Sequence, residues 1–268
     1  MSISDYTEGK ALNHIFNGAG VAYTPPTTVY LGLSTADPGD DAAGLAEPSG
    51  NGYIRKAITF AAAASRSIAQ NADVVFNQAT GAWGTLTHYG VFDAESGGDM
   101  LAHEALNESK VVISGNTPKV LSGEITVSWI ANEIADYLAN KLLDFVFRNQ
   151  AFTQPDTWVA LPTDTVEDSD TGSTITEPAE NGYARKQVNE NGGSSPTWDL
   201  VSAGLVDNGD IITMGPPTGD WGTCVAVAIL GAISAGNLLL YDNAMDDEEI
   251  GDGDTVKFPA GDLDNILT

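Results

Sequence analysis

Three histidines are the side chains in this sequence best suited to acid–base catalysis, because histidine titrates near neutral pH. They stand far apart in the chain, and no nucleophile motif lies beside any of them. The chain also contains two copies of one segment, and a catalytic site inherited by both copies would keep its histidine in both. The histidines and their counterparts in the second copy are His14 and Phe145, His88 and Ala226, and His103 and Tyr241. We therefore predict no catalytic residues and no enzymatic activity.

Carboxylates offer a second kind of chemistry, because paired acids hydrolyse glycosides and clustered acids bind calcium. The sequence has 37 acidic residues, so a pair found by inspection carries little information. Glu47 and Glu177 occupy matching positions, each followed by a proline, which favours a turn or an ion pair. The acidic runs at 167–170 and 246–254 lack the spacing of a twelve-residue calcium loop. We expect these runs to be solvated, and we predict neither a metal site nor a cofactor.

The charge balance limits the possible partners. The chain has 37 acidic and 11 basic residues, which gives a formal net charge of −26. Such a surface repels phosphate groups, so nucleic acids and anionic membranes are not expected to bind. The excess of acid suits either a protein adapted to salty surroundings or an ordinary acidic protein. The single cysteine, Cys224, lies in an apolar run and is predicted to be buried and unreactive.

An internal duplication organises the chain. Motifs of the first half recur in the same order in the second, which carries extra residues mainly between Lys186 and Trp221. The matched segments are Asp5-Tyr6 with Asp136-Tyr137, Glu47-Pro48 with Glu177-Pro178, Asn51-Gly52-Tyr53 with Asn181-Gly182-Tyr183, Trp83-Gly84-Thr85 with Trp221-Gly222-Thr223, and Ser96 and Gly98 with Ser234 and Gly236. This order predicts two tandem domains, residues 1–129 and 130–268.

Most basic residues are matched between the copies. An increasingly acidic chain would lose cations that have no role, so we predict that each matched cation holds an ion pair or covers the core with its methylene groups. The matched basic and tryptophan residues are Lys10 and Lys141, Arg55 and Arg185, Lys56 and Lys186, Lys119 and Lys257, and Trp83 and Trp221. The favoured partners of the two arginines are Glu47 and Glu177, or Asp5 and Asp136. The tryptophan rings are expected to pack into the core of their own domain.

Each copy is predicted to open with an α-helix and to continue in short strands. Apolar residues from Ile130 to Val146 follow the helical period, and residues 29–33 alternate as a half-buried strand does. Further strands are predicted in the first copy at residues 56–60, 73–76, 86–92, 100–103, 110–113 and 124–129. The predicted fold class is mainly β: two tandem antiparallel β-sandwich domains of jelly-roll-like form, each opening with an α-helix.

Several of these segments together resemble a known group. They are the Asp-Tyr and Lys of the opening helix, the stretch from Val29 to Pro38, Gly52-Tyr53-Ile54-Arg55-Lys56, the stretch from Trp83 to Ala94, and Gly115-Asn116-Thr117-Pro118. In this order they resemble a tail-fibre-like structural module of tailed bacteriophages, present here as a tandem duplicate. The second copy departs from the pattern where Asp93 and Pro118 become Gly231 and Val256. The resemblance implies a component of the virion.

The expected function is therefore that of a non-enzymatic structural protein, exposed on the tail or capsid surface in a fibre-like or decoration role. The expected partners are other virion proteins, either a tail protein or the major capsid protein, with a homo-oligomer on the particle. Docking is expected through neutral surfaces, such as the opening helices or Ala61-Ala62-Ala63-Ala64. The alternative is a carbohydrate- or receptor-binding module, which would stack sugars on exposed aromatic side chains. The candidates for that stacking are Tyr23, Trp158 and Trp198, although core packing is favoured for Trp158. No signal peptide or membrane span is recognised, so synthesis is expected in the host cytoplasm.

Overall fold

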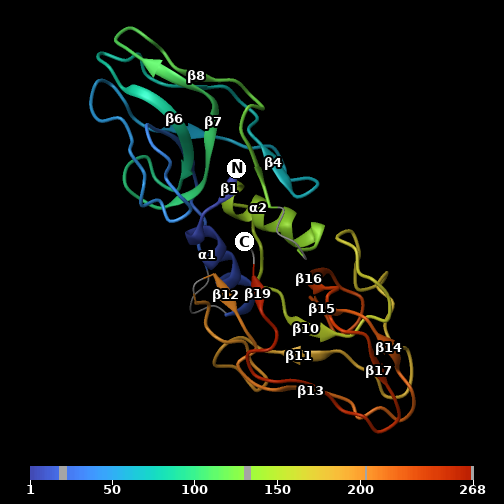
Figure 1. The fold of residues 1–268 in the computed structure, drawn as a ribbon. Coiled ribbons are helices and arrows are strands. Elements are labelled where there is room, and N and C mark those ends of the chain that lie inside the picture. The colour runs from blue at the N-terminus through green and yellow to red at the C-terminus, as the bar shows by residue number, and fades with distance from the viewer. Residues whose placement is uncertain (18–22, 130–133, 203, 267–268) are drawn as a thin grey trace. The chain divides into compact units, whose positions relative to one another are not determined.

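The computed structural model describes residues 1–17, 23–129, 134–202 and 204–266. The fold is mainly β, with antiparallel sheets and two α-helices, as the sequence predicts (Figure 1). Two compact units are present, and neither is a continuous stretch of chain. Unit 1 contains Met1–Glu8, Thr24–Trp129 and Asn140–Phe152, and unit 2 contains Gly9–Tyr23, Ile130–Ala139 and Thr153–Thr268. The predicted domain boundary between residues 129 and 130 stays a prediction of where the first repeat ends.

A five-stranded antiparallel sheet in the order β1-β7-β6-β2-β3 forms the centre of unit 1. Its strands are β1 (Ser2–Ile3), β2 (Val29–Ser34), β3 (Lys56–Ile58), β6 (Gly84–Phe92) and β7 (Met100–Val112). Two small pairs join β4 (Ser67–Ala69) to β9 (Thr126–Ser128) and β5 (Val74–Val75) to β8 (Lys119–Val120). The inward residues of the central strands, among them Leu31, Val91 and Leu101, are fully buried, so this sheet carries the core.

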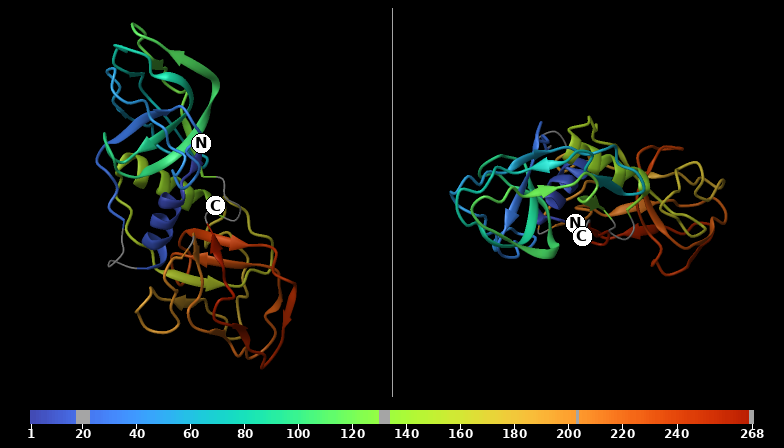
Figure 2. Two further views of the ribbon diagram at one scale, coloured as in Figure 1. Left: turned by 60° about the vertical axis from the view of Figure 1, so that its left-hand side comes forward. Right: turned by 90° about the horizontal axis from the view of Figure 1, so that it is seen from above.

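The longest strands of unit 1, β6 and β7, form a hairpin that can be followed in Figures 1 and 2. The prediction of separate strands at 100–103 and 110–113 is wrong, because β7 runs without a break from Met100 to Val112. The pairing is interrupted by a bulge: Leu86 pairs with Lys110, but His88 already pairs with Ala105. The bulge pushes residues 106–109 out of the ladder. Residues 107–109 of that segment, Asn-Glu-Ser, are polar and exposed.

Unit 2 repeats this arrangement with shorter strands. Its central sheet has the order β11-β10-β15-β16, with β10 (Thr157–Ala160), β11 (Lys186–Val188), β15 (Val227–Leu230) and β16 (Leu238–Asp242). The small pairs are β12 (Leu205–Val206) with β19 (Asn265–Ile266), β13 (Ile212–Met214) with β18 (Val256–Phe258), and β14 (Gly222–Cys224) with β17 (Glu248–Ile250). Two separate strands, β16 and β17, stand where unit 1 has the single strand β7. A core of small and branched side chains, including Ala160, Ala228 and Leu230, fills the unit.

Both predicted helices are present. Helix α1 (Asp5–Phe16) is preceded by Ser4, whose hydroxyl accepts the Thr7 N–H at 3.3 Å and so caps the first turn. Helix α2 (Asp136–Arg148) begins later than the periodicity from Ile130 predicts. Ile130 lies outside the described residues, and Ile134 forms a β-bridge with Leu240 before the helix begins.

Each unit is completed by helix residues that belong to the other sequence copy. In unit 2 the ring of Phe16, from the end of α1, packs edge-on against Trp198 with 4.8 Å between ring centroids. In unit 1 the ring of Phe147, from the end of α2, packs against Phe60 at 5.6 Å. The Asp144 carboxylate of α2 also accepts the Ala63 N–H at 2.9 Å. The two copies have therefore exchanged the second halves of their opening helices.

Candidate functional site

An ion cluster with a buried arginine lies between β3 and the turn after β6 in unit 1. Arg55 is 5% exposed and its Nε and Nη2 donate to the two oxygens of Glu47, at 3.0 and 2.6 Å. The same guanidinium donates through Nη1 to the carbonyls of Ala94 and Gly97, at 2.9 and 2.6 Å. The Tyr53 hydroxyl donates to Glu47 at 2.6 Å. A single arginine thus joins a carboxylate to a distant backbone turn.

Unit 2 contains the same cluster at the matched positions. Arg185 is 6% exposed and contacts both oxygens of Glu177, with Nε at 3.1 Å from Oε1 and Nη2 at 2.5 Å from Oε2. Its Nη1 donates to the carbonyls of Ala232 and Ala235 at 2.9 and 2.7 Å. Tyr183 donates to Glu177 at 2.6 Å. The predicted ion pairs of both arginines with the matched glutamates are confirmed, and the alternative aspartate partners are not used.

The chemistry of this cluster is structural. Each carboxylate is engaged by an arginine fork and a tyrosine hydroxyl, and the Arg55 guanidinium also lies 3.5 Å from the centroid of the Phe92 ring. Burial, together with the neighbouring glutamate, raises the pKa of both tyrosines well above the usual range, so their hydroxyls stay protonated donors. The turn whose carbonyls accept hydrogen bonds from each arginine contains a matched glycine at positive φ, +68° at Gly98 and +79° at Gly236. A residue with a Cβ would be strained there.

Each matched tryptophan packs against the tyrosine of its cluster. Trp83 and Trp221 are 4% and 5% exposed, and each indole N–H donates to the carbonyl of a matched asparagine, Asn51 at 2.9 Å and Asn181 at 3.1 Å. Trp83 packs edge-on against Tyr53 with 5.2 Å between centroids. The expectation of buried rings at equivalent sites in the two copies is confirmed by these contacts.

The matched lysines occupy less uniform surroundings. Lys119 forms an ion pair with Asp73 at 2.6 Å, but the residue that corresponds to Asp73 next to Lys257 is Ile211, so that pair has no counterpart. Lys10 and Lys141 lie in α1 and α2, and Lys56 and Lys186 begin β3 and β11. Among these residues, Lys56 donates to the Asn77 side chain at 2.7 Å. A role common to both members of each lysine pair stays a prediction.

Two histidines that are distant in sequence meet in unit 1. His103 Nε2 lies 2.9 Å from Asp40, and His88 Nε2 lies 3.7 Å from Asp37. The Ser2 hydroxyl donates to the same Asp40 oxygen at 2.9 Å, so the aspartate stands between serine and histidine. A nucleophilic serine needs the histidine beside it instead. The His103 hydrogen bond lowers the pKa of Asp40, and the group joins the N-terminal strand β1 to the sheet.

The other chemical candidates from the sequence are buried. Cys224 is fully buried, and desolvation raises its thiol pKa to about 11, as expected for an unreactive thiol. His14 is buried in α1. Tyr23 and Trp198 are also buried, so they do not supply the exposed stacking surface that the alternative of a sugar-binding module would need. Trp198 packs on Phe16, and its indole N–H donates a hydrogen bond to Thr157 within the same unit, so its role is in the core. Trp158 is half-buried.

One titratable group was not singled out by the sequence. Glu8 in α1 is 9% exposed, and desolvation, with Asp5 and Asp40 nearby, raises its pKa to about 7 from 4.5. The corresponding residue in the second copy is Ala139, so no matched motif marks the position. A carboxyl whose folded-state pKa is raised stabilises the fold only while it is protonated.

We expect the Glu8→Gln variant to be more stable than the parent chain at pH 8, by about 1–2 kcal/mol. The stabilising effect of the protonated carboxyl is complete below pH 4.5 and is lost as the pH rises through about 7. The difference between the two chains should therefore vanish near pH 4. Urea unfolding at both pH values measures it, and Glu95→Gln, at an exposed carboxylate that does not contribute to the raised pKa of Glu8, is the control. A constant difference across the range would contradict the raised pKa.

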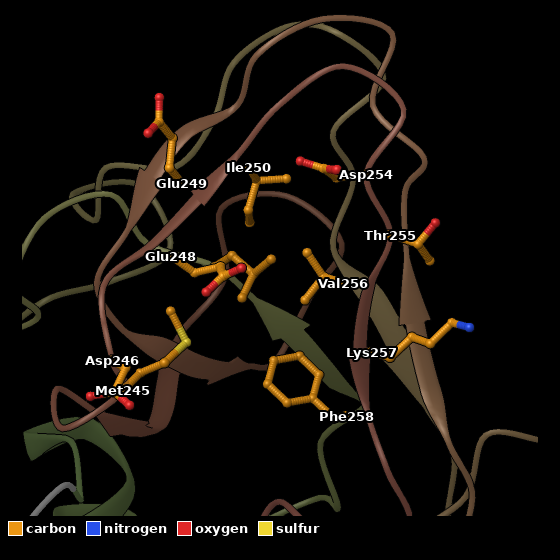
Figure 3. A pocket seen from close by; sticks show the side chains of 11 residues that line it. Met245, Asp246, Glu248, Glu249, Ile250, Asp254, Thr255, Val256, Lys257 and Phe258 are labelled. Atoms are coloured by element: carbon orange, nitrogen blue, oxygen red, sulfur yellow. The ribbon is translucent and has the colours of Figure 1, made fainter.

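A cavity of about 520 Å³ opens beside the β14–β17 pair of unit 2 (Figure 3). Leu161, Ile250 and Phe258 form its buried apolar lining. The segment between β16 and β17 contributes Met245, and Glu248 projects from β17 toward the same space (Figure 3). Along β17 and β18 the side chains alternate, so Glu249 and Lys257 point away from the cavity in the same view.

Unit 1 has a cavity at the corresponding place, of about 460 Å³. Leu33 takes the position of Leu161, since each backbone N–H is bonded to the matched tyrosine hydroxyl. The bulge of β7 forms one wall with Leu106, and Lys110 takes the position of Glu248. The structure thus places a cavity under the same interruption of the hairpin in both units. Sequence reasoning missed it because the wall is a bulge, which leaves no motif.

Across the described parts of the chain, no helix is long and apolar enough to span a bilayer. Within the same residues, His, Cys, Asp and Glu side chains form no group of three or more that could hold a metal ion. The acidic run at 246–249 is exposed.

Comparison with known proteins gives one family. Residues 2–128 and 133–265 each match the model of the family described as podophage GP4 fiber I protein gp80. No curated protein matches the chain. The two matches follow one another and cover almost the whole sequence, in agreement with the duplication seen in the residues and in the repeated clusters.

Proposed function

We propose, from the premise that this chain belongs to the family of podophage GP4 fiber I protein gp80, that it is a non-enzymatic module exposed on the surface of a tailed-phage particle. The family places it among phage fibre proteins and so among virion structural components. The observation that carries the proposal is the double family match, one to each repeat. The largely buried Arg–Glu–Tyr clusters support it, because their charged groups are engaged with one another and fix loops in both units.

Attachment to the particle is proposed through neutral surfaces of unit 1. The opening helices, which we expected to dock, have their apolar residues buried in the units, such as Leu12 in α1 and Leu142 in α2. Exposed apolar side chains lie instead near the end of β7, where Val111 is 67% and Ile113 is 56% exposed. The residue in the position of Val111 in unit 2 is Glu249, so the second copy presents charge at that place.

Labelling of purified particles tests the location. An antibody raised against this chain, imaged by electron microscopy, should mark the particle at the fibre positions. The partners proposed there are a tail protein or the major capsid protein, with several copies of this chain together. Labelling of free protein only, with none on intact particles, would refute the proposed location.

We expect retention of this protein on particles to increase with salt. A chain of formal charge −26 repels an acidic partner surface, and added salt shortens the screening length from about 10 Å at 0.1 M. The measurement is the amount that sediments with particles across a salt series. Progressive loss at rising salt would mean that opposite charges hold the protein in place.

The exposed apolar face near the end of β7 can be tested with a substitution that copies the corresponding residue of unit 2. Val111→Glu places in unit 1 the side chain that unit 2 carries at Glu249, on an exposed strand position. We expect it to weaken retention while leaving the fold intact. Glu249→Val is the control, and it should leave retention unchanged. Equal retention of the Val111→Glu variant would exclude this face.

A further inference from the structure

We propose that the cavity of unit 2 is a binding site for a protonated amine carried on an apolar carbon frame, with Glu248 as the counter-ion. Its volume of about 520 Å³ falls in the range that small-molecule sites occupy. The proposal rests on this cavity and its lining, and is independent of where the particle carries the chain.

The walls define the apolar part of the ligand. Leu161 is fully buried, Ile250 is 2% exposed and Phe258 is 8% exposed, so the floor of the cavity is apolar and well packed. Met245 lies across from Phe258 in the close view (Figure 3). An unbranched thioether adapts to ligands of different shape, and an aromatic ring can also attract a cation through its face.

The charge inside the cavity defines the polar part. Of the acidic residues around it, Glu248 projects into the space, while Glu249 on the next position of β17 projects away (Figure 3). The Asp254 carboxylate at the rim is already engaged, since it accepts the Gly251 N–H at 2.8 Å. Lys257 points outward in the same view, so it does not neutralise Glu248. A carboxylate over an apolar floor favours an ammonium group on an apolar body.

The cavity of unit 1 is an internal comparison. The pairing of Leu86 with Lys110 corresponds to that of Cys224 with Glu248, so the inward carboxylate of unit 2 is replaced by an ammonium group in unit 1. Lys110 is already paired with Glu108 at 2.8 Å. The two cavities have similar volume and opposite charge at this position. Amine binding is therefore assigned to unit 2 alone.

Phenethylamine is a suitable probe, and methionine methyl resonances of the full chain are a suitable readout. The chain has four methionines, and Met245 is the one that lines this cavity, whereas Met100 lies in the core of unit 1. We expect a saturable shift of the Met245 signal at millimolar amine, with Met100 unchanged. Phenylethanol, which has the same frame without the charge, should bind at least about tenfold more weakly.

Two variants distinguish the effect of the Glu248 carboxylate from that of the negative charge of the protein as a whole. Glu248→Gln should weaken phenethylamine binding at least about tenfold, and Glu249→Gln, an identical change on the other face of β17, should leave it unchanged. Both positions are exposed, so neither change disturbs the core. The proposal is overturned if the amine and the alcohol bind equally, if both variants behave alike, or if Met245 shows no saturable shift.

Discussion

Replacing Arg55 with methionine is expected to lower the free energy of unfolding by about 3–5 kcal/mol, because it removes a buried cation and leaves the partly buried Glu47 carboxylate without its partner. The same change also frees the carbonyls of Ala94 and Gly97, which the guanidinium now holds. Chemical denaturation of the full chain measures the effect. Arg185→Met should also be destabilising, since Arg185 makes the matching contacts to Glu177, Ala232 and Ala235 and donates in addition to the Gly172 carbonyl at 2.9 Å.

An exposed ion pair of unit 1 is the control for this experiment. Lys110 and Glu108 lie 2.8 Å apart with side chains that are 63% and 79% exposed, so Lys110→Met should cost far less stability than Arg55→Met. The double change Arg55→Met with Glu47→Gln should recover part of the loss, because no unpaired charge then remains. A loss for Arg55→Met no greater than for Lys110→Met would show that the cluster does not hold the fold.

Truncation of Trp83 or Trp221 to alanine is expected to cost about 3–5 kcal/mol each. Either change removes a ring that is at most 5% exposed and leaves the carbonyl of Asn51 or Asn181 without its indole donor. The void would lie beside Tyr53 or Tyr183, whose rings stand 5.2 and 5.1 Å away. The thermal unfolding of both variants, measured in the same buffer, tests the prediction.

The half-buried Trp158 of β10 provides the comparison, because its ring is already partly in water. Trp158→Ala should cost less than either of the other two changes. If all three cost the same small amount, the matched tryptophans do not pack as the contacts indicate. If only one of the matched pair is costly, the two copies differ in packing at this site.

The repeated residues were the part of the structure that the sequence predicted best. Arg55 and Glu47 stand eight positions apart, as do Arg185 and Glu177, and opposite charges kept at the same spacing in both copies of an acidic chain indicate an ion pair. The bounds of β7 were missed because a bulge keeps the polar residues 107–109 inside one strand. The start of α2 was missed because an apolar residue such as Ile134 fits the buried face of a helix as well as it fits the β-bridge that it forms with Leu240.

Features that form where residues far apart in the sequence come together could not be recognised from the sequence. His88 and His103 meet at Asp37 and Asp40 because β6 and β7 pair, and spacing along the chain does not report that. The raised pKa of Glu8 depends on burial that only the packed helix provides. The two cavities depend on the same interruption in two hairpins. The histidine cluster and the cavities are properties of strand register, which a single sequence specifies only weakly.

The exchanged helix ends have a consequence for half-length chains. A single repeat expressed alone would carry a helix whose second half, with Phe16 or Phe147, packs on the opposite unit in the full chain. Two such molecules could complete one another by trading these segments, which is domain swapping between identical subunits. The fused chain makes that trade within one molecule, where the tether keeps the effective concentration of the missing segment high at any dilution. Fusion of the two repeats therefore makes the exchange of helix ends intramolecular and independent of protein concentration.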